Sequence, residues 1–266
     1  MLFRSRVGAG ADRGAGGAGG HRPGGRRRDR HAGAVEQVRQ LGHGQLQPAQ
    51  ALVFCNTKID CQNVEQHLAK AGFDVCALHG DLEQRDRDEA MVRFQNGSVR
   101  VLVATDVAAR GLDVSDLPLV FSYELAHQAD VHVHRVGRTG RAGKDGRALA
   151  LVAPSEMGRV QAIEQQMGLT ARWQRLDLSS IKLAPLKADW KTVVIDAGRK
   201  DKLRPGDILG ALTAKQQIDG KSVGKIALFD TRSYVALHKS AAEKALQLLR
   251  QDKIKGRSFR VRLLSP

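Results

Sequence analysis

The sequence contains only three cysteines, Cys55, Cys61 and Cys76, and no apolar run long enough to cross a bilayer. An odd number of cysteines at these spacings does not match a disulfide scaffold and indicates a reducing compartment. Their spacing relative to His79 does not match a paired zinc-ligand pattern either, so we predict no metal site. We therefore expect a soluble cytoplasmic protein that does not contact membranes.

The sequence also lacks the phosphate-binding loop GxxxxGK[ST]. The nearest strings, Gly143-Lys144-Asp145 and Gly220-Lys221-Ser222, have no glycine five residues before the glycine that precedes lysine. Without that loop the backbone offers no cradle for nucleotide phosphates. We expect that these 266 residues alone do not hydrolyse ATP.

Positive charge is abundant but unevenly distributed. The net charge of +15 divides into +6 for residues 1–50, −1 for residues 51–186 and +10 for residues 187–266. A basic segment next to a nearly neutral one is typical of a polyanion-binding module attached to another domain. The alternative is a basic surface that only keeps the protein soluble and binds no polyanion.

Residues 1–46 contain twelve glycines, nine arginines and few periodic apolar residues, so they cannot build a core. We predict disorder there. Tails of this composition can bind RNA non-specifically. However, lysine is absent before Lys58, and Leu2-Phe3-Arg4-Ser5 resembles translated adapter sequence, so we favour a non-native origin and leave this segment out of the fold prediction.

From residue 47 to residue 176 the pattern predicts strands that alternate with helices. Residues 51–55 form a short apolar run that ends at Asn56-Thr57, which is typical of a buried parallel strand. Helical spacing follows over residues 60–71, and the alternation continues with helices over 83–94 and 129–137. This alternation predicts an open parallel α/β sheet that binds ligands at the carboxyl ends of its strands.

The string HRVGRTGR, residues 134–141, places Arg138 and Arg141 three apart beside two glycines. A guanidinium is always charged and presents several donors in a planar fork, which suits the terminal phosphates of a nucleotide. Gly137 and Gly140 would allow turns and close backbone approach. A solvated basic loop is the alternative for this string taken alone.

Three further motifs precede this string, namely ALVFCNTK (51–58), LHGDLEQRDRDEAMVRF (78–94) and VLVATDVAARGLDV (101–114). Together the four motifs resemble the second RecA-like domain of the DEAD-box RNA helicases, over roughly residues 50–180. The resemblance implies a RecA-like parallel sheet, ATP with Mg²⁺ as cofactor and RNA as substrate. The DEAD tetrapeptide is absent, so the Mg²⁺ ligands would lie in a first domain that this sequence does not contain.

The resemblance also implies roles for individual residues on the ATP side. Arg138 and Arg141 would contact the γ-phosphate, and Asp113 would bind the ribose hydroxyls. His134 would couple the nucleotide site to the RNA site, and Arg110 would link this domain to the DEAD segment of the first domain. We therefore predict catalytic roles for His134, Arg138 and Arg141.

On the RNA side, Thr105 and Arg87 resemble residues that contact the RNA backbone. Thr57, Gly80 and Asp81 fall near the same edge of the predicted sheet, so we include them in the RNA-binding set. In this family ATP and RNA bind across a cleft, and closure of the two domains bends the bound strand. The alternative is that Arg87 is an ordinary surface arginine and Thr105 an ordinary strand-end threonine, neither of which contacts RNA.

After a linker over residues 177–187, residues 188–266 form a second predicted domain. A strand over 191–196 is followed by a helix with Pro205 and Asp207 in its first turn, and then by strands VGKIALF and SYVALH. A helix over 240–250 and a last strand, SFRVRLL, complete the order. The order βαββαβ is that of an RNA recognition motif (RRM).

An ordinary RRM stacks bases on aromatic residues of two strands. Here only Tyr234 fits, and the predicted first strand has no aromatic residue. Contacts to RNA phosphates by basic side chains are then favoured over stacking. The candidates are Lys191, Arg199, Lys200, Lys202, Lys253, Lys255, Arg257 and Arg260.

The strings RPGDILGALT, VGKIALF and KIKGRSFRVRLL make this second domain similar to the tail of a bacterial group of DEAD-box helicases. That similarity implies a 23S-type rRNA hairpin and the pre-50S particle as partners, with action in ribosome assembly by a monomer. A non-catalytic RNA-binding adaptor that kept the domain fold is the alternative. A DNA helicase of the same superfamily is a third reading, against which the RNA-type tail argues.

Overall fold

The computed structural model describes residues 2–7, 48–110, 114–140, 146–174, 185–214 and 217–264. Its contacts divide the chain into two compact units. Unit 1 comprises residues 1–83 and 101–186, and unit 2 comprises residues 84–100 and 187–266.

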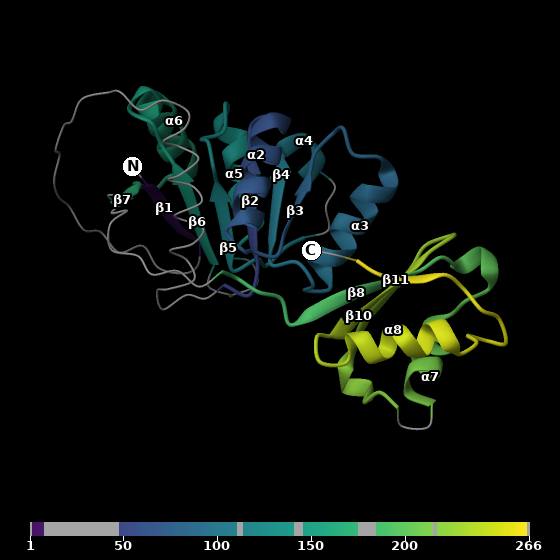
Figure 1. Ribbon diagram of the computed structural model, residues 1–266. Helices are drawn as coiled ribbons and strands as arrows, with labels where there is room; N and C mark the ends of the chain where they lie inside the picture. Colours follow the sequence, from purple (N-terminus) through teal and green to yellow (C-terminus); the bar gives the residue numbers. More distant parts are fainter. Residues whose placement is uncertain are drawn as a thin grey trace. The chain divides into compact units, whose positions relative to one another are not determined.

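Unit 1 contains a seven-stranded sheet in the order β3-β4-β2-β5-β6-β1-β7 (Figure 1). Neighbouring strands from β3 to β6 pair in parallel, which confirms the predicted open parallel sheet. These strands are almost entirely buried and apolar, as expected where both faces of a parallel sheet are covered. Their bounds are β2 (Ala51–Cys55), β3 (Val75–Leu78), β4 (Val101–Thr105), β5 (Leu119–Ser122) and β6 (Gly146–Leu151).

Helices follow the strands of unit 1. They are α2 (Lys58–Lys70), α4 (Asp106–Ala109), α5 (Ala129–Val136) and α6 (Met157–Met167), with a 3₁₀ turn, η1 (Pro154–Glu156), before the last. Helices α2 and α5 were predicted, whereas α4 lies where a loop was expected and α6 was not predicted. Thr57 caps α2, because its Oγ1 accepts a hydrogen bond from the backbone N–H of Asp60 at 3.1 Å. None of the described helices is long and apolar enough to span a membrane.

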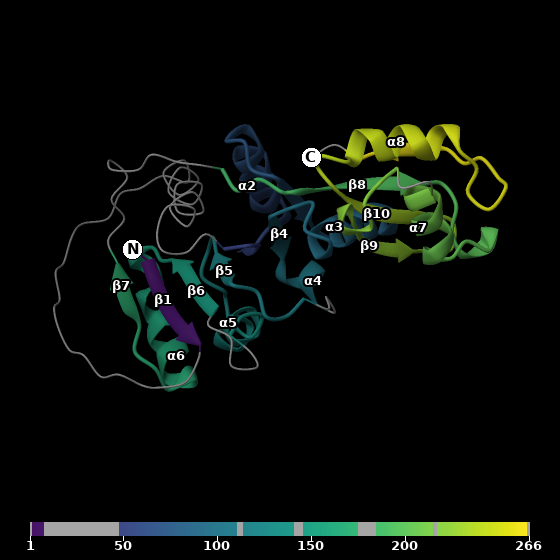
Figure 2. The same ribbon diagram turned by 90° about the horizontal axis from the view of Figure 1, so that it is seen from below.

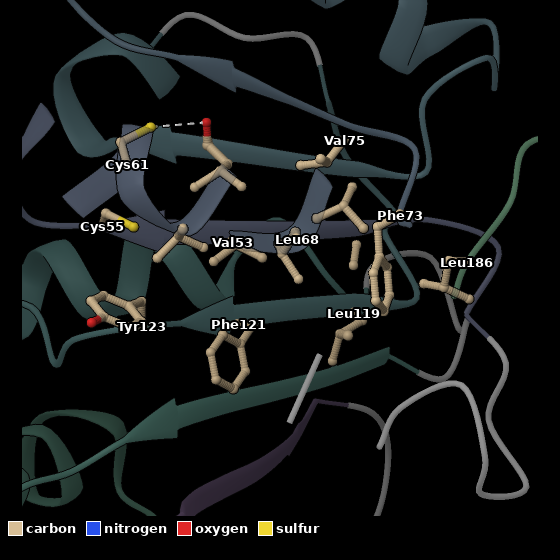
Figure 3. Close-up of a cluster of buried hydrophobic side chains, with 14 of the residues drawn as sticks. Val53, Cys55, Cys61, Leu68, Phe73, Val75, Leu119, Phe121, Tyr123 and Leu186 are labelled. Carbon is tan, nitrogen blue, oxygen red and sulfur yellow. Dashed lines mark hydrogen bonds between the residues drawn. The ribbon is translucent and has the colours of Figure 1, made fainter. Parts of the chain in front are cut away.

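Alternate side chains of the strands serve two cores. On one face, Cys61 and Leu68 of α2 pack against Val53 of β2 and Phe121 of β5 (Figure 3). On the other, Ala150 of β6 packs with residues of α6. All three cysteines are buried, and burial raises the pKa of Cys61 to about 12 and that of Cys55 well above its usual value. These thiols therefore stay protonated and unreactive.

Residues 2–7 correct our expectation of disorder for the amino-terminal segment. They form β1 (Leu2–Val7), which pairs antiparallel with β6 and with β7 (Arg172–Gln174). Strand β6 pairs with β5 on one side only, so its other side is open to main-chain hydrogen bonds from β1. The glycine-rich composition on which we based the prediction begins only after Val7. Residues 8–47 lie outside the described residues, so disorder there stays a prediction.

Unit 2 contains an antiparallel sheet in the order β11-β8-β10-β9, with two helices against it (Figure 2). The element order after residue 187 is βαββαβ, which confirms the predicted RRM-like domain. Bounds are β8 (Trp190–Ile195), α7 (Pro205–Thr213), β9 (Val223–Leu228), β10 (Ser233–His238), α8 (Ala242–Gln251) and β11 (Val261–Leu263). Unit 2 also includes α3 (Gln84–Gln95) and the short helices η2 (Arg199–Asp201) and η4 (Gly220–Ser222).

The two faces of this sheet differ in their contacts. Val235, Leu237 and Val261 face the helices α7 and α8. Tyr234 lies on the other face, but it is only 2% exposed because Val194, Leu264 and Val92 of α3 pack around it. Burial also raises the pKa of Tyr234. The Tyr234 ring is thus covered in this arrangement, and its predicted role in RNA binding stays a prediction.

The first strand of this sheet begins one residue earlier than predicted, and that residue is aromatic. Trp190 pairs with His238 of β10, and their rings meet edge to face with centroids 5.8 Å apart. A Cβ on Gly224 of β9 would lie 3.0 Å from the Trp190 ring. Trp190 thus packs across three strands, and the statement that the first strand lacks an aromatic residue is corrected.

We expect Gly198→Ala to destabilise unit 2, because the backbone of the β9–β10 turn lies directly against this glycine. An added Cβ would lie 2.1 Å from the carbonyl oxygen of Phe229 and 2.8 Å from the backbone nitrogen of Arg232. Backbone atoms held by strand pairing cannot yield as a side chain can, so the free energy of unfolding should fall by roughly 1–3 kcal/mol or more. Urea unfolding followed by Trp190 fluorescence, in a Trp173→Phe background, measures it.

Gly206→Ala is the matched control for this change. Gly206 lies in the first turn of α7, and nothing would approach its Cβ within 4 Å. The control should be neutral or stabilising, since alanine favours helix. Equal unfolding midpoints for the two variants would contradict the close-packing argument.

Candidate functional site

The carboxyl ends of the parallel strands in unit 1 place polar residues from distant parts of the sequence along one edge of the sheet. Asn56 and Thr57 follow β2, Asp106 follows β4, and Glu124 comes two residues after β5. In open parallel sheets this edge is where ligands bind. The candidate site of unit 1 is built on it.

A cavity of about 520 Å³ opens at this edge, between α4 and α5. Its wall contains three of the predicted residues, Arg110, His134 and Arg138. Arg110 and His134 are exposed, and Arg138 is half-buried. The remaining lining residues are Phe54, Asp106, Ala109, Val131, Val133, Arg135 and Gly137. Cationic side chains beside an apolar floor suit an anionic ligand that also carries a flat apolar group.

Arg135 is a residue that our sequence interpretation missed. It is 1% exposed and makes a bidentate ion pair with Asp106, with Nε–Oδ1 at 2.7 Å and Nη2–Oδ2 at 2.6 Å. Nη1 also donates to the carbonyl oxygen of Glu124 at 2.8 Å, and Nη2 donates to Oδ1 of Asn56 at 2.7 Å. The guanidinium lies 5.2 Å from the centre of the Phe54 ring. One buried side chain thus connects three strand ends.

Arg138 lies in the turn that follows α5. Its Nη1 donates to the carbonyl oxygen of Val114 at 3.4 Å, and its own carbonyl accepts from the N–H of Leu117 at 3.0 Å. Gly140 has a φ of +69°, so glycine is needed there as predicted. Gly137 has a φ of −62°, which any residue can adopt, so its conformation does not require glycine, and the close backbone approach expected there stays a prediction.

The two histidines of α5 have different environments. His134 is exposed and lines the cavity, whereas His132 is 2% exposed. Burial, with a smaller effect of Arg135, lowers the pKa of His132 to about 4. His132 is therefore neutral at physiological pH, and a titration near neutral pH cannot be assigned to it.

The predicted RNA residues of unit 1 lie at the ends of β2, β3 and β4. Thr57 is exposed and its hydroxyl is used in capping, donating to Asp60 Oδ2 at 2.6 Å. Asp81 forms an exposed ion pair with Lys58 at 2.8 Å, and its hydrogen bond with Lys58 lowers the pKa of Asp81. Gly80 is exposed. Thr105 is buried at the N-cap of α4, where its side chain makes no capping hydrogen bond.

Asp113 and Arg141 lie outside the described residues, so their roles stay predictions. Arg87 is half-buried on α3 and belongs to unit 2. No group of metal-ligating side chains occurs within the part of the chain that the structure describes.

In unit 2, most of the predicted RNA residues gather in two adjacent loops, which we call the basic loop cluster, residues 199–204 and 253–257. The Nζ of Lys255 donates to the carbonyl oxygen of Lys202 at 3.2 Å, and Arg257 lies 3.5 Å from Asp201. The exposed cations of the cluster are Arg199, Lys200, Lys202, Arg204, Lys253, Lys255 and Arg257. This density of positive charge suits a phosphate backbone.

The backbone of the basic loop cluster is unusual. Lys202 and Lys255 have φ values of +60° and +52°, a conformation that residues with a Cβ rarely adopt. Such conformations gather at functional sites more often than elsewhere. Lys191 and Arg260 lie outside the cluster, with Lys191 on β8 at 3.6 Å from Glu243 and Arg260 exposed before β11.

Comparison with protein families matches two parts of the chain. Residues 33–143 match the helicase conserved C-terminal domain, and residues 192–263 match the DbpA RNA binding domain. The first match begins before residue 47, where we expected the native domain to start.

Curated relatives match both units. The chain is 51% identical over 218 residues to the ATP-dependent RNA helicase DbpA of Escherichia coli, covering 82% of this chain and 48% of that protein. It is 30% identical over 235 residues to DbpA of Bacillus subtilis, covering 80% of this chain and 49% of that protein. The chain thus spans about half the length of these relatives.

Among solved structures, the E. coli DEAD-box protein SrmB bound to RraA matches with a TM-score of 0.47 and 34% identity, over 51% of this chain and 78% of that one. The motifs at the sheet edge, the two family matches and the relatives agree with one another. The chain therefore belongs to the DEAD-box family of RNA helicases and contains their conserved carboxyl-terminal domain followed by a DbpA RNA-binding domain.

Proposed function

We propose that this chain forms the carboxyl-terminal half of an ATP-dependent RNA helicase that acts on large-subunit ribosomal RNA. The observation that carries the proposal is the cavity at the carboxyl edge of the sheet, where Arg110, His134 and Arg138 meet. These side chains can neutralise phosphate charge but cannot by themselves hold a nucleotide and its Mg²⁺. A first RecA-like domain with a phosphate-binding loop and a DEAD sequence would complete the site.

The arginines of the cavity fit the phosphates of ATP, whereas the ligands for Mg²⁺ would have to come from the first domain. When bound, ATP supplies a phosphoryl group that can be transferred to water. Arg138, with Arg141, would neutralise the charge that develops on this group, and Asp113 would bind the ribose hydroxyls. Arg110 would contact the first domain, so that the site is complete only when the two domains meet.

RNA is proposed to bind at two places. The strand ends of unit 1, with Thr57, Gly80, Asp81 and Thr105, would contact the RNA backbone. The basic loop cluster of unit 2 would bind a hairpin of 23S-type rRNA and direct the helicase to the pre-50S particle. The match to a DbpA RNA-binding domain and the exposed cations of the cluster support this choice.

We further propose that the protein acts as a monomer in the cytoplasm. Three buried thiols support a reducing compartment, since none is placed for a structural disulfide.

Binding titrations at several salt concentrations test the RNA proposal. For the 266-residue chain we expect an rRNA hairpin to bind more tightly than a generic duplex, with log K falling linearly with log[salt]. Neutralising three cations of the cluster should weaken binding and reduce the salt slope by about three. The variant is Lys200→Gln, Lys255→Gln and Arg257→Gln.

A second triple variant removes the same charge elsewhere on unit 2. It carries Lys187→Gln, Lys221→Gln and Lys244→Gln, all at exposed positions outside the basic loop cluster. In this control variant the slope of log K against log[salt] should change much less than in the first triple variant. Equal losses in both variants would overturn the cluster as the RNA site, and equal affinity for hairpin and duplex would overturn the rRNA target.

A further inference from the structure

We propose that Arg135 is a positioning residue that links the RNA-binding strand ends to the phosphate-binding helix α5 within unit 1. The inference rests on the proposed function, because it concerns the same edge of the sheet. Arg135 also lines the cavity, but it is 1% exposed and four of its five N–H donors are used by protein groups. It acts through Asn56, Asp106 and the helix on which it lies.

The first step of the argument is chain adjacency. Each partner of Arg135 is next in sequence to a residue of the proposed RNA site, since Asn56 precedes Thr57 and Asp106 follows Thr105. Arg135 itself follows His134 and lies one turn before Arg138, both of which line the cavity. The Arg135 guanidinium thus connects the strand ends of the proposed RNA site with the helix that carries the cavity residues.

The second step is geometry. Four of the five N–H donors of Arg135 are used at 2.6–2.8 Å, two on Asp106 and one each on Asn56 and the Glu124 carbonyl. Asn56 continues the network, because its Nδ2 donates to the carbonyl oxygen of Leu125 at 3.1 Å. The planar guanidinium is bonded to three strand ends, so a shift of one strand end strains the hydrogen bonds at the other two.

The third step is the choice of residue. Lysine would keep the charge but could not make the bidentate pair and reach two further oxygens at once. If Arg135 served only to balance the charge of Asp106, lysine would be an adequate replacement. If Arg135 transmits a displacement from the strand ends to α5, lysine at this position should abolish that coupling while unit 1 stays folded.

Hydrogen–deuterium exchange on the 266-residue chain, with and without saturating oligouridylate, tests this role. In the wild type, RNA should slow amide exchange both at the strand ends, residues 55–60 and 104–108, and in α5. In Arg135→Lys the strand ends should stay protected by RNA, whereas α5 in the RNA-bound state should exchange about tenfold faster than in the wild type. A purely structural defect would speed exchange in α5 equally with and without RNA.

Two further variants make the result decisive. Asn56→Ala removes one of the four bonds of the guanidinium together with the bond from Asn56 to the Leu125 carbonyl, and should show the same uncoupling if Arg135→Lys unfolds. Arg172→Lys is the control, because Arg172 is exposed on β7, outside the network of Arg135. This control should keep protection in α5.

RNA protection of α5 that persists in Arg135→Lys and Asn56→Ala would overturn the inference while leaving the proposed function intact. Wild-type protection confined to the strand ends would also overturn it. If RNA protects neither segment of the wild type, the proposed RNA site of unit 1 fails, and the inference fails with it.

Discussion

Arg138→Ala should lower ATP turnover by about 10³-fold or more in a helicase that carries this chain as its carboxyl-terminal half. Arg138 lines the cavity from the turn after α5, and its fork could reach a phosphate held by the first domain. Charge that develops on a transferring phosphoryl group is stabilised most by a cation already in place. Alanine removes that cation and leaves the backbone of the turn unchanged.

Steady-state ATPase assays with saturating RNA measure this loss, and parallel titrations measure RNA affinity. RNA binding should stay near the wild-type value, because the basic loop cluster is untouched. Arg172→Ala is a suitable control, since Arg172 is exposed on β7, away from the carboxyl edge. Turnover that matches the wild type in Arg138→Ala would contradict the assignment of Arg138 to the phosphate site.

The second large effect concerns stability. Arg135→Met should lower the free energy of unfolding of unit 1 by about 3–5 kcal/mol, because it removes one partner of a buried ion pair. The Asp106 carboxylate would lose its bidentate partner, and Asn56 and the Glu124 carbonyl would each lose a donor. The melting temperature of unit 1 should fall by roughly 10 °C.

Trp173 lies on β7 of unit 1, so its fluorescence in a Trp190→Phe background reports the unfolding of that unit. Lys58→Met is the control. Lys58 pairs with Asp81 at 2.8 Å, and both side chains are more than half exposed. The loss of Lys58 should therefore cost at most about 1 kcal/mol. If the two variants lost the same stability, the central importance of Arg135 in the fold would be refuted.

Much of the fold could be predicted because the spacing of apolar residues and the residues that form turns and helix ends depend only on nearby sequence. The strand at 51–55 and the helix that opens at Pro205 were predicted to within a few residues. Asp207 accepts from the backbone N–H of Arg204 at 2.9 Å, the first-turn carboxylate that the sequence indicated. The pairing of β1 with β6 was missed because it joins residues far apart in the chain and depends on main-chain bonds, which composition does not report.

The candidate site was only partly predictable, for a similar reason. The motif string identified His134 and Arg138, which the structure places on one cavity. Arg135 lies between them and was passed over, because its partners are 29 and 79 residues away and nothing local marks it. An arginine between His134 and Val136, two residues after Val133, was the available signal, since a charge that is buried beside apolar residues needs a partner.

The burial of all three thiols bears on how domain closure could be observed. Cys55, Cys61 and Cys76 account for every cysteine of the sequence, and all are enclosed by the core of unit 1. A maleimide dye would therefore react mainly at a cysteine introduced on the surface, with the native residues left in place. Fluorescent reporters could then be attached to this half of the molecule without rebuilding its interior.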